Sequence, residues 1–304
     1  NAIPVFCDIK NDTFCLDPEK LENVVTPLTK AIIPVHLFGN SCDMDEIVDF
    51  AKKNDLRIIE DCAQAPGGIY KNKNLGSIGD CGIFSFQESK TIMTGEGGML
   101  TTNDEEIAEI ARMVRNHGEI ISPTLKERTY KTEFLGWGYR MTELEAALGL
   151  AQLPKLDYFN EERIKLGSYL SQEINKIDGL SHVKYEYVNH VYWMFGFTYD
   201  EEKIGIPRDL FCDALVEEGI PCFKGYVEPL YLNPLYLEKK AFAFKHYTGN
   251  VTYEKGLCPV AESLHEKQLI NTLICRPPAL IEDMKNMIDA IHKILKNKDE
   301  LLNI

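Results

Sequence analysis

A lysine and an aspartate stand where their side chains could do chemistry together. Lys90 follows an apolar segment, residues 82–86, and a short polar loop, and Asp61 ends a second apolar segment that begins at Leu56. If both segments are neighbouring parallel strands, the two side chains meet at one edge of the sheet. An amine and a carboxylate so placed could bind pyridoxal phosphate (PLP), because the amine can form a Schiff base and the carboxylate can keep the pyridine nitrogen protonated. The pair therefore predicts a PLP site.

Three neighbouring residues are further candidates for contacts with the cofactor. Ala63 is small enough for a ring to lie on the backbone, and Gln64 could bond the ring oxygen or only a nearby loop. Ser85 could donate its hydroxyl to the cofactor phosphate or bond within its own strand. Residues 95–98, Gly-Glu-Gly-Gly, precede an apolar strand pattern and lack a Gly-Lys-Ser/Thr ending. They therefore indicate a tight turn rather than a nucleotide phosphate loop.

Plainer interpretations stay open at this stage. Most lysines are solvated surface residues, and aspartate is a common helix N-cap, so Lys90 and Asp61 could each be ordinary. His36, at the end of an apolar segment, could contact the substrate or could be a structural histidine bonded within the fold. The Cys, His and Asp residues show no spacing typical of a metal site, and we expect none.

Composition excludes several classes of function. The 304 residues, 44% hydrophobic and 26% charged, are typical of a globular protein with one large and one smaller domain. The net charge of −14 argues against nucleic acid or an anionic membrane as a partner. No apolar run approaches the roughly 18 residues of a membrane span. The nine scattered cysteines, without a Cys-x-x-Cys pair, indicate reduced thiols in a cytoplasmic protein.

Alternating apolar and amphipathic segments predict an α/β fold with a mainly parallel sheet flanked by helices. We expect a large domain over residues 1–155, and a linking helix with a small α+β domain over residues 156–304. The pattern Thr142-x-x-Glu145 predicts a capped helix. The expected strands are 31–37, 56–59, 82–86, 99–102 and 192–199, and the expected helices are 43–54, 104–115, 142–153, 156–177, 208–218 and 283–295.

Several segments, in this order, resemble the DegT/DnrJ/EryC1/StrS family of PLP-dependent sugar aminotransferases, which have the aspartate aminotransferase fold (fold type I). The likeness covers essentially the whole chain and is densest between residues 31 and 153. The matching segments are 33–39 (IPVHLFG), 59–65 (IEDCAQA), 79–80 with 84–86, Lys90 with 94–98, 102–104, 115–118 and 139–143.

The resemblance implies a role for each candidate residue. Lys90 would be the Schiff-base lysine, Asp61 the partner of the pyridine nitrogen, Gln64 a neighbour of the ring hydroxyl and Ser85 a phosphate ligand. Tyr139 and Arg140 would lie near the substrate or a homodimer interface, although Arg140 could instead pair with a carboxylate to hold the capped helix. The implied reaction is transamination of a keto sugar, expected to be nucleotide-linked, with glutamate or glutamine as amino donor, for amino-sugar or polysaccharide biosynthesis.

The chain also departs from the family pattern. It begins at Asn1, after the N-terminal phosphate turn and the ring-stacking aromatic residue of the family, so we expect an N-terminal segment to be missing. Gly138 stands where the family often has Asn, and Pro66 where it often has His. Two other functions stay open: a PLP-dependent sugar dehydratase, as in relatives with His in place of the lysine, and a non-catalytic truncated relative. Lys90 favours transamination. Arg208 and Tyr226 could touch the substrate.

Overall fold

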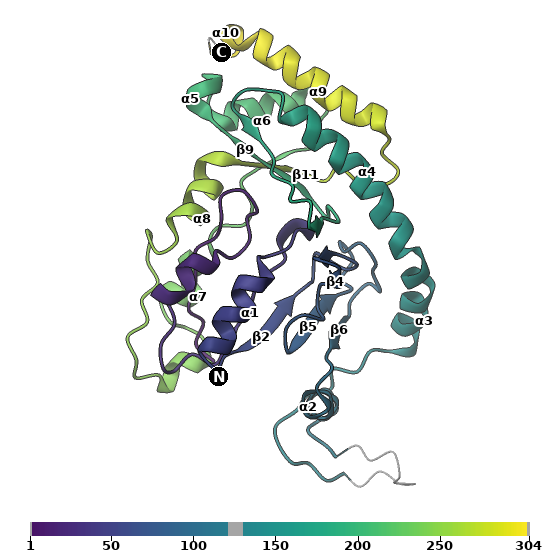
Figure 1. Cartoon of the computed structure of the whole chain (residues 1–304), viewed down its shortest axis with the longest axis vertical. Coiled ribbons are helices and arrows are strands. Elements are labelled where there is room, and N and C mark those ends of the chain that lie inside the picture. Colours follow the sequence, from purple (N-terminus) through teal and green to yellow (C-terminus); the bar gives the residue numbers. More distant parts are fainter. Residues whose placement is uncertain (1, 121–129, 303–304) are drawn as a thin grey trace.

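The computed structural model describes residues 2–120 and 130–302, and its first half is built on a four-stranded sheet (Figure 1). The order is β1 (Ala31–Ile32), β2 (Arg57–Asp61), β5 (Cys81–Ser85) and β6 (Gly98–Thr101). The first three strands are parallel, and β6 runs antiparallel to β5. The predicted α/β fold with a mostly parallel sheet is confirmed.

The first predicted strand is much shorter than residues 31–37. Only Ala31 and Ile32 form β1, and Val35 makes an isolated parallel bridge to Asp61. Pro34 stands between them and has no N–H to donate to a ladder, so a continuous strand is interrupted there. Its carbonyl still accepts the N–H of Asp61 at 2.9 Å, which keeps the chain beside β2.

Helix α1 (Met44–Lys53) packs against β2, as its amphipathic pattern predicts. Its buried side chains, Met44, Ile47 and Ala51, join the hydrophobic cluster under the sheet. Helices α2 (Glu105–Arg115) and α3 (Glu143–Gln152) begin at the predicted caps, Asp104 and Thr142, and α3 has the full capping box with Glu145. Helix α2 lies at the end of the molecule remote from the second sheet (Figure 1).

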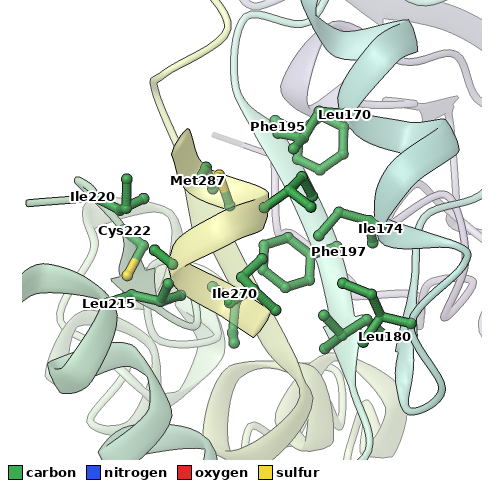
Figure 2. Close-up of a cluster of buried hydrophobic side chains, with 14 of the residues drawn as sticks. Leu170, Ile174, Leu180, Phe195, Phe197, Leu215, Ile220, Cys222, Ile270 and Met287 are labelled. Atoms are coloured by element: carbon green, nitrogen blue, oxygen red, sulfur yellow. The ribbon is translucent and has the colours of Figure 1, made fainter. Parts of the chain in front are cut away.

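The second half has its own antiparallel sheet and core. The strand order is β10 (Phe223–Lys224), β11 (Leu269–Thr272), β9 (Phe195–Tyr199) and β7 (Leu180–Ser181). Three helices pack around it: α4 (Leu156–Ile174), α6 (Arg208–Glu217) and α9 (Ile281–Lys296). Figure 2 shows how side chains of α4, β9, β11 and α9 interdigitate in this core, whose fully buried members include Leu170, Phe195, Phe197 and Ile270.

Backbone pairing ties the two halves together. Strand β8 (Val188–Asn189) of the second half pairs with β3 (Ile69–Tyr70) of the first, and β3 also pairs with β4 (Lys73–Asn74). Phe6, near the start of the chain, packs against the rings of Tyr231 and Tyr253. The division at residues 155 and 156 stays a prediction.

The remaining elements are short. They are η1 (Pro18–Asn23), η2 (Leu37–Gly39), η3 (Leu153–Lys155), α5 (Glu201–Ile204), η4 (Leu230–Leu232), α7 (Pro234–Leu237), η5 (Phe242–His246), α8 (Pro259–Ser263), η6 (Leu264–Gln268) and α10 (Lys298–Leu301). Among the described residues, no helix is both long and apolar enough to cross a membrane.

The second core yields a stability prediction. Phe197 is fully buried on β9, so Phe197→Ala should lower the free energy of unfolding by about 3–5 kcal/mol, through lost burial and a new cavity. Denaturant titration measures this change. Phe223→Ala is the matched control, because Phe223 is 49% exposed and its removal should change stability little. Equal effects of both substitutions would contradict this account of the core.

Candidate active site

The carboxyl ends of β2 and β5 bring three predicted site residues to one edge of the sheet. Asp61 ends β2 and lies level with Ile83 of β5 in the parallel register. Ser85 is the last residue of β5, and Lys90 lies in the loop that follows it. Asp61 also acts electrostatically on the Lys90 amine. The structure therefore places Asp61 and Ser85 at the carboxyl ends of adjacent strands, with Lys90 in the loop after β5, and their roles at a PLP site stay predictions.

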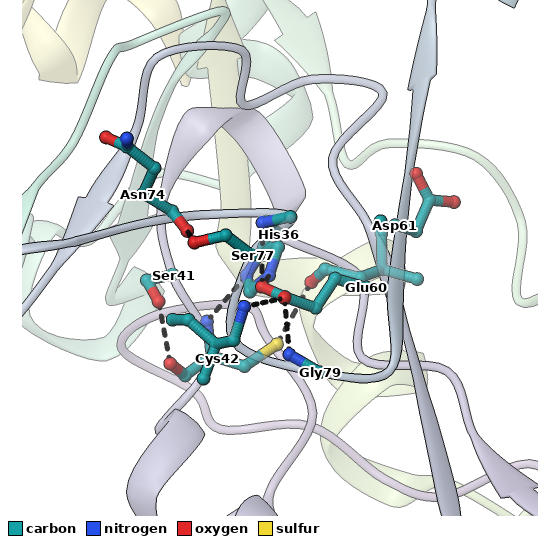
Figure 3. A network of polar contacts seen from close by, with 12 residues as sticks. His36, Ser41, Cys42, Glu60, Asp61, Asn74, Ser77 and Gly79 are labelled. Atoms are coloured by element: carbon teal, nitrogen blue, oxygen red, sulfur yellow. Dashed lines mark hydrogen bonds and ion pairs between the residues drawn. The ribbon is translucent and has the colours of Figure 1, made fainter. Parts of the chain in front are cut away.

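A buried carboxylate, Glu60, ties the end of β2 to the loop that precedes β5 (Figure 3). It accepts backbone N–H groups from Gly76, Ile78 and Gly79 at 2.6–2.9 Å, and its other neighbour is His36 Nε2 at 3.1 Å. Burial opposes the charge, but the hydrogen bonds of His36 and of the backbone outweigh it, so the pKa of the Glu60 carboxyl lies below its ordinary value. Glu60 is thus a charged anchor between β2 and the loop that leads into β5.

The carboxylate of Asp61 points away from this network, as Figure 3 shows. Successive side chains of a strand face opposite sides, so the burial of Glu60 leaves Asp61 on the other face. One oxygen, Oδ1, accepts the N–H of Ala63 at 2.9 Å, and this bond fixes the orientation of the carboxylate. Among the described residues nothing bonds the second oxygen, which is therefore free to accept a proton donor from a ligand.

The amine of Lys90 is covered by an aromatic ring. Its Nζ lies 4.9 Å from the centroid of the Trp193 ring, and no carboxylate of the described residues forms an ion pair with it. Burial lowers the pKa of Lys90, and the charge of Asp61 opposes that shift only in part. A lysine with a lowered pKa is neutral, and hence nucleophilic, more of the time. The plainer interpretation of Lys90 as a solvated surface lysine does not fit this environment.

Gln64 is held by groups from both halves of the chain. Its Oε1 accepts the N–H of Phe38 at 2.7 Å, and its Nε2 donates to the hydroxyl of Tyr226 at 3.1 Å. Phe38 has a left-handed backbone (φ 60°), which is uncommon for a bulky residue, and its ring packs edge-on against Tyr226. No other described residue accepts the second N–H of the Gln64 amide, which could therefore bond a ligand.

Ser85 also keeps a donor available. Its Oγ accepts the N–H of Gln87 at 3.3 Å, and among the described residues its hydroxyl hydrogen has no acceptor. Ala63, half-buried in the turn after β2, presents no side chain beyond a methyl group. Both positions are compatible with their predicted contacts to PLP, which stay predictions.

His36 does not fit its predicted contact with substrate. It is fully buried, Nε2 faces Glu60, and Nδ1 accepts the N–H of Cys42 at 3.2 Å. Both ring nitrogens are used within the fold, so the structural interpretation of His36 accounts for its place.

His36, Glu60 and Cys62 bring a nitrogen, an oxygen and a sulfur within 4.8 Å of one another, a spacing that could hold a metal ion. The hydrogen bonds just described already occupy Glu60 and His36. Burial, with the charge of Glu60, raises the pKa of the Cys62 thiol, which therefore stays protonated and is a poor ligand. The group is better explained as structural support for the end of β2 and the loop before β5.

The sequence neighbours Tyr139 and Arg140 make their contacts with residues outside the Lys90 site. Tyr139 is 67% exposed and stacks on Trp137. Arg140 donates to the amide oxygen of Asn116 at 2.8 Å, and it forms no ion pair with a carboxylate of the described residues. Their roles at a substrate or subunit interface stay predictions.

Arg208 is buried and donates to the carbonyls of residues 265, 266 and 269, so a structural role replaces the substrate contact considered for it.

Sequence reasoning missed Trp193 as a neighbour of the lysine. The sequence pattern predicts one strand over residues 192–199, whereas β9 begins only at Phe195, and Tyr192 has a left-handed backbone (φ 46°). This turn carries Trp193 out of the strand toward the Lys90 loop. No local pattern marks such a contact, because Trp193 and Ser89 are 104 residues apart in the sequence. The one available signal was that the chain has only two tryptophans.

Comparison with known proteins decides the family. The sequence model of the DegT/DnrJ/EryC1/StrS aminotransferase family matches residues 1–291. The chain belongs to this family. A GDP-perosamine synthase from Caulobacter vibrioides is 40% identical over 243 residues, which cover 77% of this chain and 62% of that protein.

Solved structures agree with the family assignment. The aminotransferase from Psychrobacter cryohalolentis superimposes with a TM-score of 0.85 at 32% identity, over 97% of this chain and 76% of that one. A GDP-4-keto-6-deoxymannose-3-dehydratase with a trapped PLP–glutamate geminal diamine has a TM-score of 0.76 at 28% identity, over 94% of this chain and 74% of that one. The predicted fold type I is confirmed.

The protein is therefore a PLP-dependent aminotransferase of this family. The residues present fit the cofactor: within residues 2–120 and 130–302, nothing forms an ion pair with the Lys90 amine, bonds the second oxygen of Asp61 or accepts the hydroxyl hydrogen of Ser85. The family assignment also confirms the resemblance that the sequence motifs indicate.

The Glu60 anchor yields a prediction about pH. Glu60→Gln replaces an acceptor oxygen by an NH₂ group facing backbone donors, and should destabilise the fold by about 3 kcal/mol near neutral pH. The folded carboxyl has a pKa below the unfolded value of about 4.3, so its contribution is complete above that value and is lost as the pH falls through the folded pKa. Urea titrations at neutral and acidic pH should show that the difference in unfolding free energy between the native chain and Glu60→Gln becomes smaller as the pH falls.

Glu88→Gln is the control, because Glu88 is an exposed glutamate of the same region. The free energy of unfolding of the Glu88→Gln variant should equal that of the native chain at every pH. A Glu60→Gln deficit that is the same at acidic and neutral pH would show that the charge of Glu60 is not the stabilising feature.

Proposed function

We propose that this aminotransferase transfers an amino group from glutamate or glutamine to a nucleotide-linked keto sugar. The observation that carries the proposal is the pair formed by Lys90 and Asp61. The Lys90 amine has a lowered pKa and no ion pair among the described residues, and Asp61, whose charge acts on it, keeps one oxygen that no described residue bonds. Such a pair can bind PLP covalently and keep its ring nitrogen protonated.

Bound PLP supplies an electron sink and a carrier for the amino group. The protein supplies the proton transfers and the orientation. Lys90, displaced by the amino donor, would be the base that takes a proton from the donor carbon and delivers it to the cofactor, because its lowered pKa makes the amine neutral more of the time. Asp61 would hold the protonated ring nitrogen, since the N–H of Ala63 already fixes its Oδ1. Ser85 would hold the phosphate, and Gln64 the ring oxygen, with an amide N–H that no described residue accepts.

The relatives support a GDP-linked sugar as the first substrate to test. The GDP-perosamine synthase and the GDP-4-keto-6-deoxymannose-3-dehydratase both carry a GDP sugar in their names. The net charge of −14 does not oppose an anionic nucleotide, since binding needs only a local group of cations. We propose an amino sugar for polysaccharide biosynthesis as the product. Nine cysteines without a disulfide support a reducing compartment, the cytoplasm, as its location.

The similarity to a dehydratase makes sugar dehydration the second candidate function. The two reactions differ in their products. Transamination consumes one glutamate for each sugar and gives an amino sugar, whereas dehydration gives a deoxy keto sugar and no stable amine. A lysine at position 90 favours transamination, because it can move the proton in both half-reactions.

We also propose that the chain acts as a homodimer. Helix α3 is apolar around most of its circumference, yet it has no buried residue, and Leu144 and Leu150 are 85% and 73% exposed. A helix of this composition is normally buried on all sides. Strand β6 is likewise exposed at every position. Exposed apolar surface of this kind supports a protein interface, and a second copy of the chain is the proposed cover.

Product analysis tests the function. Native protein with PLP, glutamate and GDP-4-keto-6-deoxymannose should give 2-oxoglutarate and an amino sugar in equal amounts, seen by mass spectrometry. Lys90→Ala should lower the rate of amino-sugar formation by about 10²–10⁴-fold, the usual contribution of a positioned acid–base group. It should also abolish covalent PLP binding. A deoxy keto sugar in place of the amino sugar would establish the dehydratase.

Lys73→Ala is the matched control, because Lys73 is exposed on β4. It should keep native activity and the native visible absorbance with PLP. A native chain that binds no PLP would favour the non-catalytic function and contradict the proposal.

Light scattering during gel filtration tests the dimer. Leu144→Glu places a charge on the exposed apolar helix and should shift the chain from dimer to monomer, because burying an unpaired carboxylate in an interface is costly. Leu28→Glu is the control, since Leu28 is 72% exposed and lies outside α3. A native chain that is monomeric at high concentration, or a Leu144→Glu variant that stays dimeric, would contradict the proposed interface.

A further inference from the structure

Trp193 contacts the Lys90 loop in two ways. Its Nε1–H donates to the carbonyl oxygen of Ser89 at 3.0 Å, and its ring centroid lies 4.9 Å from Lys90 Nζ. Trp193 is 8% exposed and comes from the segment just before β9, in the second half of the chain. One side chain therefore holds both the backbone before the lysine and the amine itself.

We propose that Trp193 is a positioning residue for Lys90: its indole N–H fixes the Ser89 carbonyl, and its ring covers the amine on the side that it faces. This inference rests on the proposed function, in which Lys90 binds the cofactor and moves the proton. It assigns to the second half of the chain a direct part in preparing the lysine.

Trp193 is itself held firmly. The buried guanidinium of Arg163, on α4, donates to the carbonyls of Tyr192 and Trp193 at 3.1 and 3.3 Å. The backbone of Met194 donates to the carbonyl of Phe38, the residue that also bonds Gln64. The segment that carries Trp193 to Lys90 and the side chain of Gln64 therefore both bond the backbone of Phe38.

Gly39 allows this close approach. A Cβ at this position would lie 2.9 Å from the backbone nitrogen of Trp193, and its backbone is left-handed (φ 90°), a conformation that suits glycine. The segment that carries Trp193 thus fits directly against the loop after β1. This packing leaves the indole little freedom to move away from Ser89.

The Trp193 ring has two opposing effects on the protonation of the Lys90 amine. The π face attracts an ammonium group and favours the charged form. Its apolar area removes water from the amine and favours the neutral form. Burial is the dominant influence on Lys90, since its pKa is lowered despite the charge of Asp61. Removing the ring should therefore let water in and make the amine charged more of the time.

Competitive acylation of the cofactor-free chain tests this positioning. Acetic anhydride modifies only neutral amines, and peptide mass spectrometry gives the extent of modification of Lys90 at each pH. For Trp193→Ala, the pH midpoint of Lys90 modification should shift up toward that of exposed lysines in the same digest. Trp193→Phe keeps the apolar cover and should keep the native midpoint. This readout needs neither PLP nor activity, so it can fail independently of the proposed function.

The bond to Ser89 is tested by the rate of covalent PLP incorporation, trapped with borohydride and followed by mass spectrometry. Trp193→Phe lacks the indole N–H and should incorporate PLP several-fold more slowly, and Trp193→Ala more slowly still. Trp137→Phe is the control, because Trp137 is the other tryptophan and is 45% exposed. It should behave as the native chain in both measurements.

Circular dichroism checks that each variant folds. A native midpoint in folded Trp193→Ala would overturn the role of the ring as a cover, and a native incorporation rate in folded Trp193→Phe would overturn the role of the indole N–H. If Trp193→Ala does not fold, Trp193→Phe decides alone: an unchanged incorporation rate overturns the role of the indole N–H, and a slower rate supports it.

Discussion

A single buried charge, that of Glu60, organises the edge of the sheet where the site forms. Its two oxygens bond three backbone N–H groups of the segment before β5 and face one nitrogen of His36 (Figure 3). A buried carboxylate is tolerated only when it is fully hydrogen-bonded, so the carboxylate and the segments around it must keep their positions together. This requirement fixes the end of β2 relative to the entry into β5.

The position of Asp61 follows from the same anchor. Adjacent residues of a strand point to opposite faces, so the burial of Glu60 directs the next carboxylate into the site. Two acidic neighbours therefore have different functions. One is enclosed by donors and stays charged within the fold, and the other keeps a free oxygen for a ligand. The pair Glu60-Asp61 thus places a structural carboxylate next to one that is proposed to bind the cofactor.

The second half of the chain completes the site from the other side. Tyr226 bonds Gln64, and Trp193 contacts the Lys90 loop, so both contacts cross between the two halves. Burial lowers the pKa of Lys90, and the Trp193 ring, whose centroid lies 4.9 Å from Nζ, is one of the groups that cover the amine. The surroundings of Lys90 and Gln64 therefore include side chains from both halves of the chain.

The sequence by itself determined the features that depend on local order. The alternation of strands and helices, the caps at Asp104 and Thr142, and the placement of Asp61, Ser85 and Lys90 at strand ends all follow from periodicity and short motifs. Tertiary structure alone decided which groups surround them. His36 could bind substrate or support the fold until its two nitrogens were seen to be used. Trp193 meets the Lys90 loop because a turn before β9 folds back across a long separation, and no local pattern encodes such a contact.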